Sequence, residues 1–395
     1  MHSTDVIVIG GGASGLMCAW QAALRGRSVL VLEKGVKVGL KILVSGGGRC
    51  NFTNVHVDPH QHFLSDNAHF CVSALRRFEP ADFIELVEGA GIAYHEKKLG
   101  QLFCDESAKQ IVALLASACR DAGAMIQVRQ QVVSVQRTSA GGFRVTTTQG
   151  QFQAPQVVLA TGGLSLPKVA SDFSLRCAEH FEMRSVPSRP ALVPLTWNAA
   201  DKQRFVSLAG VAVDVSAWAD GSEFEFRENL LFTHAGLSGP AILQVSSYWQ
   251  PNSAIWINWL PELDAVQWLS QVAIEQPQKR LLGLLKTQLP KRFVDVLVSS
   301  WVGDAKLGAM HPQELQEIGE RLNKWSFIPA GTQGYATAEV TAGGIDTAEV
   351  SSKTFAAKKV PGLFVVGEAL DVTGWLGGYN FQWAWASGWC CAQYL

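Results

Sequence analysis

The sequence lacks an excess of charge of either sign and any long hydrophobic run. Its 33 Lys and Arg residues nearly balance its 34 Asp and Glu residues, so the formal net charge is −1. This balance excludes a protein that binds nucleic acid through its global charge, although it leaves room for a local basic patch. No apolar stretch reaches the ~18 residues of a membrane-spanning helix, and the first apolar run begins too early to leave space for a signal peptide. We therefore expect a cytoplasmic protein that does not bind membranes.

Signals for metal sites and disulfides are also missing. The eight cysteines form no C-x-x-C motif, and none is grouped with histidine at the spacing of a zinc site. Buried thiols in a reducing compartment are the simplest explanation. The adjacent Cys390 and Cys391 fall in a predicted helix, where core packing explains them better than redox chemistry does. We expect no metal centre.

A glycine motif near the N-terminus is the strongest positive signal. An apolar run over residues 5–9 stops at Gly10, Gly12 and Gly15, which fit G-x-G-x-x-G, and a helical pattern follows. The three glycines allow a tight turn, close approach of a pyrophosphate, and close packing of helix on strand. A second apolar run ends at Glu33, which suits the ribose hydroxyls of FAD or NAD and would repel the 2′-phosphate of NADP. The alternative is a glycine-rich turn without a ligand.

The segment after Glu33 predicts a ligand-binding loop. Residues 34–54 are rich in small residues and contain Gly46, Gly47 and Arg49. Long loops in compact domains are usually functional, although a plain surface loop is the alternative. Four short strands are then expected over residues 124–154 as a meander, and the next strand ends at Ala160-Thr161-Gly162, close to a bound nucleotide.

A late strand and helix indicate FAD rather than NAD as the resident cofactor. The strand over residues 359–366 ends at Gly367-Glu368, and Gly377-Gly378 opens the final helix, expected over 381–394. The positive end of that helix, with the backbone N–H groups of residues 379–381, would face the flavin N1–C2=O edge. Only one G-x-G-x-x-G motif is present, so NADH or NADPH would visit the flavin transiently as electron donor.

These patterns predict an α/β protein built around a Rossmann-like, glutathione-reductase-like FAD-binding domain. Residues 1–188 and 335–395 form that domain. A β subdomain (189–262 plus 326–334) and a helical subdomain (263–325) are inserted between its two parts.

Five long stretches carry a resemblance to a known family. They are residues 41–54, 160–163, 230–240, 337–344 and 371–385. Over nearly the whole chain the sequence resembles the YhiN-type family of bacterial FAD-dependent flavoproteins. The resemblance implies a β-barrel-like inserted subdomain. It also implies a branch connected with dihydrouridine in large-subunit ribosomal RNA, and a more distant type that acts on steroid double bonds.

The expected cofactor-binding residues come from both parts of the FAD domain. They are Gly10, Gly12, Ala13, Ser14, Gly15, Glu33, Lys34, Lys41, Ser45, Gly46, Gly47, Arg49, Asn51, Val133, Ala160, Thr161, Gly162, Gly367, Glu368, Gly377, Gly378, Tyr379, Asn380 and Phe381.

Reduction of an activated C=C bond requires a hydride from flavin N5, a proton donor and stabilisation of the developing enolate. We predict Cys50, Arg49 and His234 as catalytic residues. The neighbouring Arg49 would lower the pKa of the Cys50 thiol. The alternatives are a small buried residue at position 50 and a histidine at 234 that only braces its loop. Further candidate donors are Asn51, Asn54, Tyr379 and Asn380.

The substrate is left open by the sequence. A basic run in the helical insertion suits RNA phosphates, and a solvated helix face explains it equally well. The run comprises Lys279, Arg280, Lys286, Lys291 and Arg292. The leading hypothesis is a reductase that acts on ribosomal RNA uridine, followed by a reductase of a small unsaturated metabolite. A non-catalytic FAD-binding redox sensor is the alternative from another class.

Overall fold

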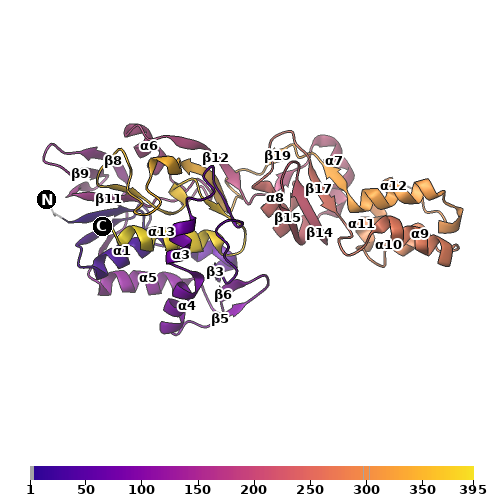
Figure 1. Cartoon of the computed structure of the whole chain (residues 1–395), viewed down its shortest axis with the longest axis horizontal. Helices are drawn as coiled ribbons and strands as arrows, with labels where there is room; N and C mark the ends of the chain where they lie inside the picture. Colours follow the sequence, from indigo (N-terminus) through magenta and orange to yellow (C-terminus); the bar gives the residue numbers. More distant parts are fainter. Residues whose placement is uncertain (1–3, 297, 302) are drawn as a thin grey trace. The chain divides into compact units, whose positions relative to one another are not determined.

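The computed structural model describes residues 4–296, 298–301 and 303–395 (Figure 1). The chain folds into two compact units. The first comprises Met1–Arg189 and Val340–Leu395, and the second comprises Pro190–Glu339. The first unit is therefore assembled from two segments that lie far apart in the sequence.

A five-stranded parallel sheet forms the centre of the first unit, in the order β21-β11-β1-β2-β7. The strands are β1 Val6–Ile9, β2 Val29–Leu32, β7 Met125–Gln127, β11 Gln156–Leu159 and β21 Leu363–Val365. Their near-continuous apolar sequences fit strands that are covered on both faces. The fold is thus the Rossmann-like FAD-binding fold that the sequence predicts.

The strand β7 corrects one detail of the sequence-based prediction. It was expected in a meander, but it pairs in parallel with β2, with Leu30 opposite Met125. Only β8 Val132–Arg137, β9 Phe143–Thr147 and β10 Gly150–Ala154 form the antiparallel meander. Apolar alternation identifies a strand, whereas its pairing partner is decided by non-local contacts.

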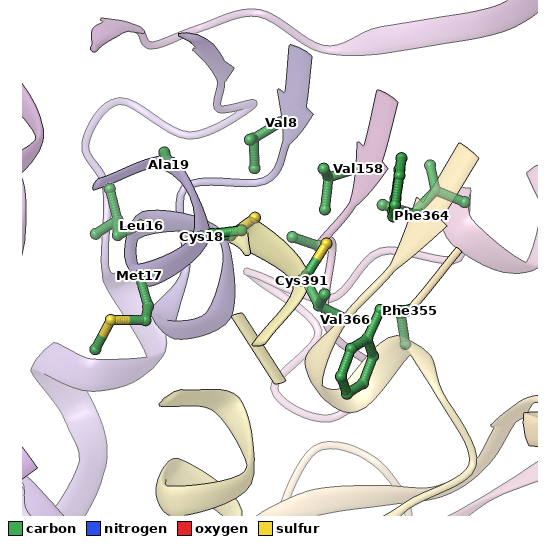
Figure 2. Packing of buried hydrophobic residues seen from close by; sticks show 14 of the residues in the cluster. Val8, Leu16, Met17, Cys18, Ala19, Val158, Phe355, Phe364, Val366 and Cys391 are labelled. Carbon is green, nitrogen blue, oxygen red and sulfur yellow. The ribbon is translucent and has the colours of Figure 1, made fainter. Parts of the chain in front are cut away.

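Three long helices belong to this unit: α1 Ala13–Leu24, α5 Lys109–Asp121 and α13 Tyr379–Ala392. Figure 2 shows Cys18 of α1 beside Cys391 of α13, with Val8 of the sheet nearby. The close approach of α13 to α1 requires a glycine, because a Cβ at Gly388 would lie 2.5 Å from the Ser14 carbonyl oxygen. Both cysteines of the 390–391 pair are buried, as core packing predicts.

The segment expected as one ligand loop is partly regular. Residues 34–54 contain the short helix α2 (Leu40–Val44), a 3-10 turn at Ser45–Gly48 and the strand β3 (Asn51–Asn54). Local hydrogen bonds, such as that from Cys50 N–H to Ser45 O, close the turn. The strand β3 begins a small antiparallel sheet, β3-β6-β5. The remaining elements of this unit are α2 Leu40–Val44, β3 Asn51–Asn54, β4 Phe63–Leu64, α3 Val72–Arg77, α4 Pro80–Gly89, β5 Tyr94–Glu96, β6 Gln101–Cys104, α6 Phe173–His180, β12 Ser185–Ala191, β20 Val340–Ile345 and β22 Thr373–Gly374.

The second unit contains a seven-stranded antiparallel sheet, in the order β18-β17-β14-β15-β16-β13-β19. Its strands are β13 Leu195–Thr196, β14 Ala212–Ala219, β15 Glu225–Phe232, β16 Gly236–Ser238, β17 Ile255–Asn258, β18 Trp325–Phe327 and β19 Gly331–Thr332. Its helices are α7 Ala199–Phe205, α8 Pro240–Ser246, α9 Ala265–Glu275, α10 Leu281–Leu285, α11 Lys291–Val296 and α12 Pro312–Asn323. Residues 206–208 form a 3-10 turn, so β14 begins only at Ala212.

Aromatic rings in mutual contact fill the core of this second unit. The rings of Trp259 and Phe293 lie 4.5 Å apart, and Trp197 contacts both Phe232 and Phe327. Such pairs contribute about 0.5–1.5 kcal/mol each beyond their buried area. Among the described residues of both units, no helix has the length and apolar character needed to cross a membrane.

Candidate cofactor and active site

In the turn between β1 and α1, the three glycines of the G-x-G-x-x-G motif have different structural roles. A Cβ at Gly10 would lie 2.4 Å from the Ala160 carbonyl oxygen, and one at Gly15 would lie 2.0 Å from the Gly10 carbonyl oxygen. These two glycines allow the strand, the turn and the helix to pack. At Gly12, no described heavy atom lies within 4 Å of an added Cβ. Gly12 therefore leaves open the space in front of the α1 N-terminus, where anions bind.

Glu33 lies at the carboxyl end of β2 beside this turn. Its Oε2 accepts a 2.8 Å hydrogen bond from Gly11 N–H, and its Oε1 accepts one of 2.6 Å from Gly35 N–H. The adjacent Lys34 is exposed and donates to the Ala170 carbonyl. The carboxylate is thus fixed at the edge of the glycine turn, which fits a ribose-binding role.

Val133 lies at an irregularity of the meander. The register of β8 with β9 shifts between Val132 and Ser134, so Val133 is the inserted residue of a β-bulge, and its side chain is 54% exposed. The nearby Gln130 N–H donates to the Glu33 carbonyl, which ties this strand to the end of β2. Its predicted contact with the cofactor stays a prediction.

The end of β11 lies against the glycine turn. Ala160 is buried beside Gly10, and the Thr161 hydroxyl lies 2.7 Å from that of Ser174. Gly162 has φ 71, and an added Cβ there would lie 3.6 Å from Glu368 Oε2. The ends of β11 and β21 therefore meet at this edge of the sheet.

A polar network connects these strand ends. Lys41 Nζ donates to Glu368 Oε2 and to Ser165 Oγ, both at 2.7 Å. Glu368 Oε1 accepts from Thr341 N–H at 2.9 Å, and the Thr341 hydroxyl oxygen accepts from Leu164 N–H at 2.8 Å. Lys41 and Glu368 were predicted from the sequence, whereas Thr341 and Ser165 were not. Thr341 does fall in one of the stretches that carried the family resemblance, which was the available signal.

The start of α13 packs on the strand that follows the glycine loop. Gly378 has φ 98, and a Cβ there would lie 2.4 Å from the Thr53 carbonyl oxygen. With its amide oxygen toward the helix, Asn51 accepts from Gly378 N–H at 3.1 Å and donates to the Leu102 carbonyl at 3.2 Å. Asn51 thus has a positioning role at this helix start. A Cβ at Gly377 would lie 3.1 Å from Gln101 Nε2.

The glycine loop itself divides into packed and open positions. A Cβ at Gly46 would come within 2.9 Å of Asn51 N, whereas at Gly47 no described heavy atom lies within 4 Å. The Ser45 hydroxyl donates to the Ile42 carbonyl. Gly47 is therefore open to a ligand, and at Gly48 the nearest atom to an added Cβ is the Leu43 carbonyl oxygen at 4.0 Å.

The expected lowering of the Cys50 pKa is wrong. The Cys50 side chain is fully buried, and burial raises the pKa of its thiol far above the ordinary value. Arg49 is exposed, and its carbonyl accepts from Cys104 N–H. Desolvation therefore outweighs any effect of the neighbouring guanidinium, and Cys50 is a neutral thiol.

Asn380 and Tyr379 are used in packing. The Asn380 amide accepts from Gly374 N–H and donates to the Gly374 carbonyl, both at 2.8 Å, so it braces the turn before α13. The buried Tyr379 ring lies 6.2 Å from that of Phe63, and Phe381 stacks on Trp385 at 5.5 Å. The backbone N–H groups of the first helical turn are thus the features of residues 379–381 that suit a flavin.

His62 is a candidate that the sequence did not reveal. Its ring lies 4.8 Å from that of Trp375 and 4.6 Å from that of Tyr379, beside the α13 start. Its Nδ1 accepts from Asp58 N–H at 3.0 Å, so Nε2 carries the proton of the neutral ring. Burial lowers the pKa of His62, which keeps the imidazole neutral near pH 7. A histidine in a histidine-rich loop gave no local signal of this placement.

His234 belongs to the second unit and is exposed. Its turn is braced by the neighbouring Thr233, whose hydroxyl donates to the Gly236 carbonyl at 2.9 Å and accepts from Gly236 N–H at 3.0 Å. The hydrogen bonds of Thr233 therefore supply the bracing that we considered for His234. The catalytic role of His234 stays a prediction.

The basic run of the second unit is partly neutralised. Arg280 pairs with Asp304 at 2.6 Å, and Lys286 pairs with Asp295. Arg292 donates to the carbonyls of Ser207 and Ala209. Both acids follow the basic run in the sequence, so the run of cations alone overstated its free charge.

Two further observations delimit the site. Within the described ranges, no group of three or more His, Cys, Asp or Glu side chains could hold a metal ion. A hollow of about 780 Å³ lies between α6 and β12, lined by residues such as Arg176, Glu179 and Arg184. Its lining contains none of the predicted cofactor residues among those described.

Residues 4–394 match the family described as HI0933-like protein Rossmann domain. The chain belongs to this family. The match covers both segments of the first unit and the whole second unit, which confirms the family resemblance found in the sequence.

Curated relatives match over almost the full chain. A protein of Escherichia coli (strain K12), named ribosomal RNA dihydrouridine synthase, is 48% identical over 397 residues, which cover 100% of this chain and 98% of the relative. A protein of the same name from Haemophilus influenzae is 45% identical and covers 98% of both chains. A 3-dehydro-bile acid delta(4,6)-reductase of Clostridium scindens is 29% identical, over 98% of this chain and 97% of the relative.

Proposed function

We propose that the first unit binds one extended FAD molecule. The observation that carries this proposal is the contact of the end of β21 with the start of α1, in the unit that also contains the glycine-opened start of α13. A Cβ at Gly367, just after β21, would lie 2.5 Å from Ser14 Oγ in the first turn of α1. Two positive helix ends in one unit suit a ligand with a pyrophosphate near one end and an electron-accepting ring at the other.

The contacts of the individual residues support this assignment. The open position at Gly12, with Ala13 and Ser14 behind it, would admit the pyrophosphate. Glu33 would accept the ribose hydroxyls of the adenosine half. Lys41 and Glu368 would lie along the middle of the cofactor, and the backbone N–H groups at the start of α13 would face the pyrimidine edge of the flavin.

We further propose that the protein is an FAD-dependent oxidoreductase that reduces a C=C bond conjugated to a carbonyl group. FAD, when bound and reduced, supplies the hydride. The relatives are named a dihydrouridine synthase and a delta(4,6)-reductase, and both reactions concern double bonds of this kind. At 45–48% identity over the full chain, the uridine of large-subunit ribosomal RNA is the favoured substrate.

Residues of the chain would stabilise the developing negative charge and donate the proton in this reaction. Hydride added to C6 of a uracil ring leaves negative charge on the C4 carbonyl oxygen, and a proton must reach C5. Peptide N–H groups at a helix start stabilise such charge. The neutral imidazole of His62 holds a proton on Nε2 beside this helix start. We favour His62 as the donor because the Cys50 thiol is fully buried; Cys50 is the alternative.

The electron donor and the location in the cell belong to the same proposal. NADH or NADPH would reduce the flavin in a transient encounter. A protein that acts on ribosomal RNA would work in the cytoplasm. A small unsaturated metabolite as substrate, and a redox sensor without catalysis, are the competing functions.

Two experiments test the proposal. Anaerobic NADH or NADPH should bleach the flavin absorbance near ~450 nm of the purified protein. Large-subunit ribosomal RNA should lose dihydrouridine when the protein is removed from the cell and regain it with the purified protein. A flavin that neither a pyridine nucleotide nor dithionite reduces would contradict the reductase and leave a non-catalytic protein that uses FAD structurally. An unchanged dihydrouridine map with a reducible flavin would favour the metabolite.

A further inference from the structure

The turn between β5 and β6 exposes two lysines and a leucine. It consists of residues 97–100, which we call the 97–100 turn. Lys97, Lys98 and Leu99 are exposed, and Leu99 keeps 58% of its surface in solvent. Leu99 has φ 52, a left-handed conformation that bulky residues rarely adopt. An exposed apolar side chain held in an unfavourable backbone conformation does little for folding, and such positions are frequent at binding sites.

A buried amide fixes this turn to the start of α13. Asn54 Nδ2 donates to the Leu99 carbonyl at 3.0 Å and to the Gly377 carbonyl at 2.9 Å. Its Oδ1 accepts from His56 N–H at 2.8 Å, so the amide is fully used. A Cβ at Gly100 would lie 2.6 Å from Asn54 Oδ1, so this close contact requires glycine. The turn is therefore positioned relative to the helix start that we assign to the flavin.

Positive side chains lie at both ends of the strand β6. Lys97 and Lys98 precede it, and Lys97 Nζ lies 5.3 Å above the ring of Phe103. Arg49 lies near its other end, where its carbonyl accepts from Cys104 N–H at 3.0 Å. The acids of the same hairpin are Glu96, before the turn, and Asp105, which pairs with His95 at 2.6 Å. Figure 1 shows β3, β5 and β6 together in the first unit.

We propose that the 97–100 turn is an RNA contact, in which Leu99 packs against the bases next to the target uridine while the lysines and Arg49 contact phosphates. This inference rests on the proposed function. A uridine within folded RNA must leave its stack before its C5–C6 edge can reach a flavin. An apolar wedge offsets the lost stacking, and cations near the wedge hold the backbone. A small free metabolite would require neither.

Two variants of the turn test separately the contribution of its lysine charges and that of the apolar Leu99 side chain. Lys97→Ala/Lys98→Ala removes two cations. Leu99→Gly removes the side chain and suits the left-handed backbone, so the fold is kept. A control, Lys202→Ala/Lys353→Ala, removes the same charge from exposed positions outside the 97–100 turn and outside the basic run of the second unit. The probe is large-subunit ribosomal RNA purified from cells that lack the protein, and FAD content and dithionite reduction are measured for each variant.

The lysine variant should bind this RNA about 5- to 10-fold more weakly near 0.1 M salt. The slope of log affinity against log salt should become shallower by about 1 to 2, since each phosphate contact contributes ~0.7–0.9. Leu99→Gly should lower the rate of dihydrouridine formation about tenfold, since wedge and stacking contacts contribute on that order per base. The FAD content of both turn variants should equal that of the wild type. The control variant should equal the wild type in RNA affinity and in the rate of dihydrouridine formation.

Opposite outcomes separate the two proposals. If the wild type forms dihydrouridine and both turn variants match it in affinity and rate, the turn is not an RNA contact and the proposed function stands. An equal loss in the control variant also overturns the inference, because the effect is then one of overall charge. If the wild type neither binds this RNA nor forms dihydrouridine, the proposed function fails and the inference fails with it.

Discussion

Lys41 and Glu368 form an ion pair of 2.7 Å although 327 residues separate them in the sequence. Their side chains keep 30% and 19% of their surface exposed, so the pair lies partly out of water. It connects α2 with the end of β21, on the path that we assign to the cofactor. The pair therefore links cofactor binding to the joining of the two segments of the first unit.

Lys41→Ala should weaken both folding and FAD binding. The Glu368 carboxylate would keep its bond from Thr341 N–H but lose its cation, so the free energy of unfolding should fall by about 1–3 kcal/mol. The FAD dissociation constant should rise about tenfold for the loss of one charge-assisted contact. Urea unfolding and flavin fluorescence during titration measure the two effects.

A surface ion pair serves as the control for this variant. Arg176 pairs with Asp172 at 3.1 Å on an exposed helix face, so Arg176→Ala should lower stability by only about 0.3–0.5 kcal/mol and leave FAD binding unchanged. Equal FAD affinity in Lys41→Ala and wild type would contradict a role of Lys41 in the cofactor site.

Gly12→Ala and Gly15→Ala should have different effects. Gly12 has φ −86, and its added methyl group would enter open space, so the apo protein should lose no more than about 1 kcal/mol. That methyl group would occupy the approach of the pyrophosphate, and FAD affinity should fall at least about tenfold. At Gly15 the methyl group would collide with the Gly10 carbonyl, and stability should fall by more than about 2 kcal/mol. Chemical denaturation of the apo forms and FAD titration distinguish the two variants. A Gly12→Ala variant with full FAD affinity would contradict our assignment of the pyrophosphate to the space in front of Gly12.

Acidification should destabilise the protein in part through His62. The folded state lowers the pKa of this side chain, so the unfolded chain binds the proton more readily. Stability should therefore fall as pH drops below the unfolded value of about 6.5, until the folded pKa is reached. Asp58 lies on the same loop and opposes the shift, whereas His56 adds to it.

His62→Asn tests this pH dependence. The Asn oxygen can take the Asp58 N–H bond, but the side chain does not titrate. Thermal unfolding between pH 7.5 and pH 5.5 should show a smaller loss for the variant than for the wild type. A parallel loss in both proteins would assign the pH dependence to other groups. If His62 supplies the proton, the variant should also lose at least about a hundredfold in kcat while flavin reduction is unchanged.

Cys50 should resist alkylation in the folded protein. Burial raises the pKa of its thiol, and the thiolate is the reactive form. Iodoacetamide at pH 8 should therefore modify Cys50 only after unfolding, as peptide mass spectrometry can show. Rapid modification of Cys50 in the folded protein would restore the reactive thiolate that the sequence suggested.

Local sequence patterns predicted the parts of this molecule that depend on near neighbours. The strand before Gly10, the helix after it and the acid at the end of β2 are determined by apolar runs and glycine positions. The parallel pairing of β7, the neutral state of Cys50 and the positioning role of Asn51 depend on residues distant in sequence. Thr341 and His62 reach the site through the path of the whole chain, and no local spacing encodes that path.

The contact of α13 with α1 has a consequence for the order of synthesis. Residues 340–395 leave the ribosome only after the whole second unit, yet they supply β21, Glu368 and the glycine-opened helix start. The nascent first segment can form the adenosine-binding turn early, but it lacks the groups that we assign to the flavin ring. Cofactor loading should therefore be a late event, completed when the returning segment closes the sheet against Ser14.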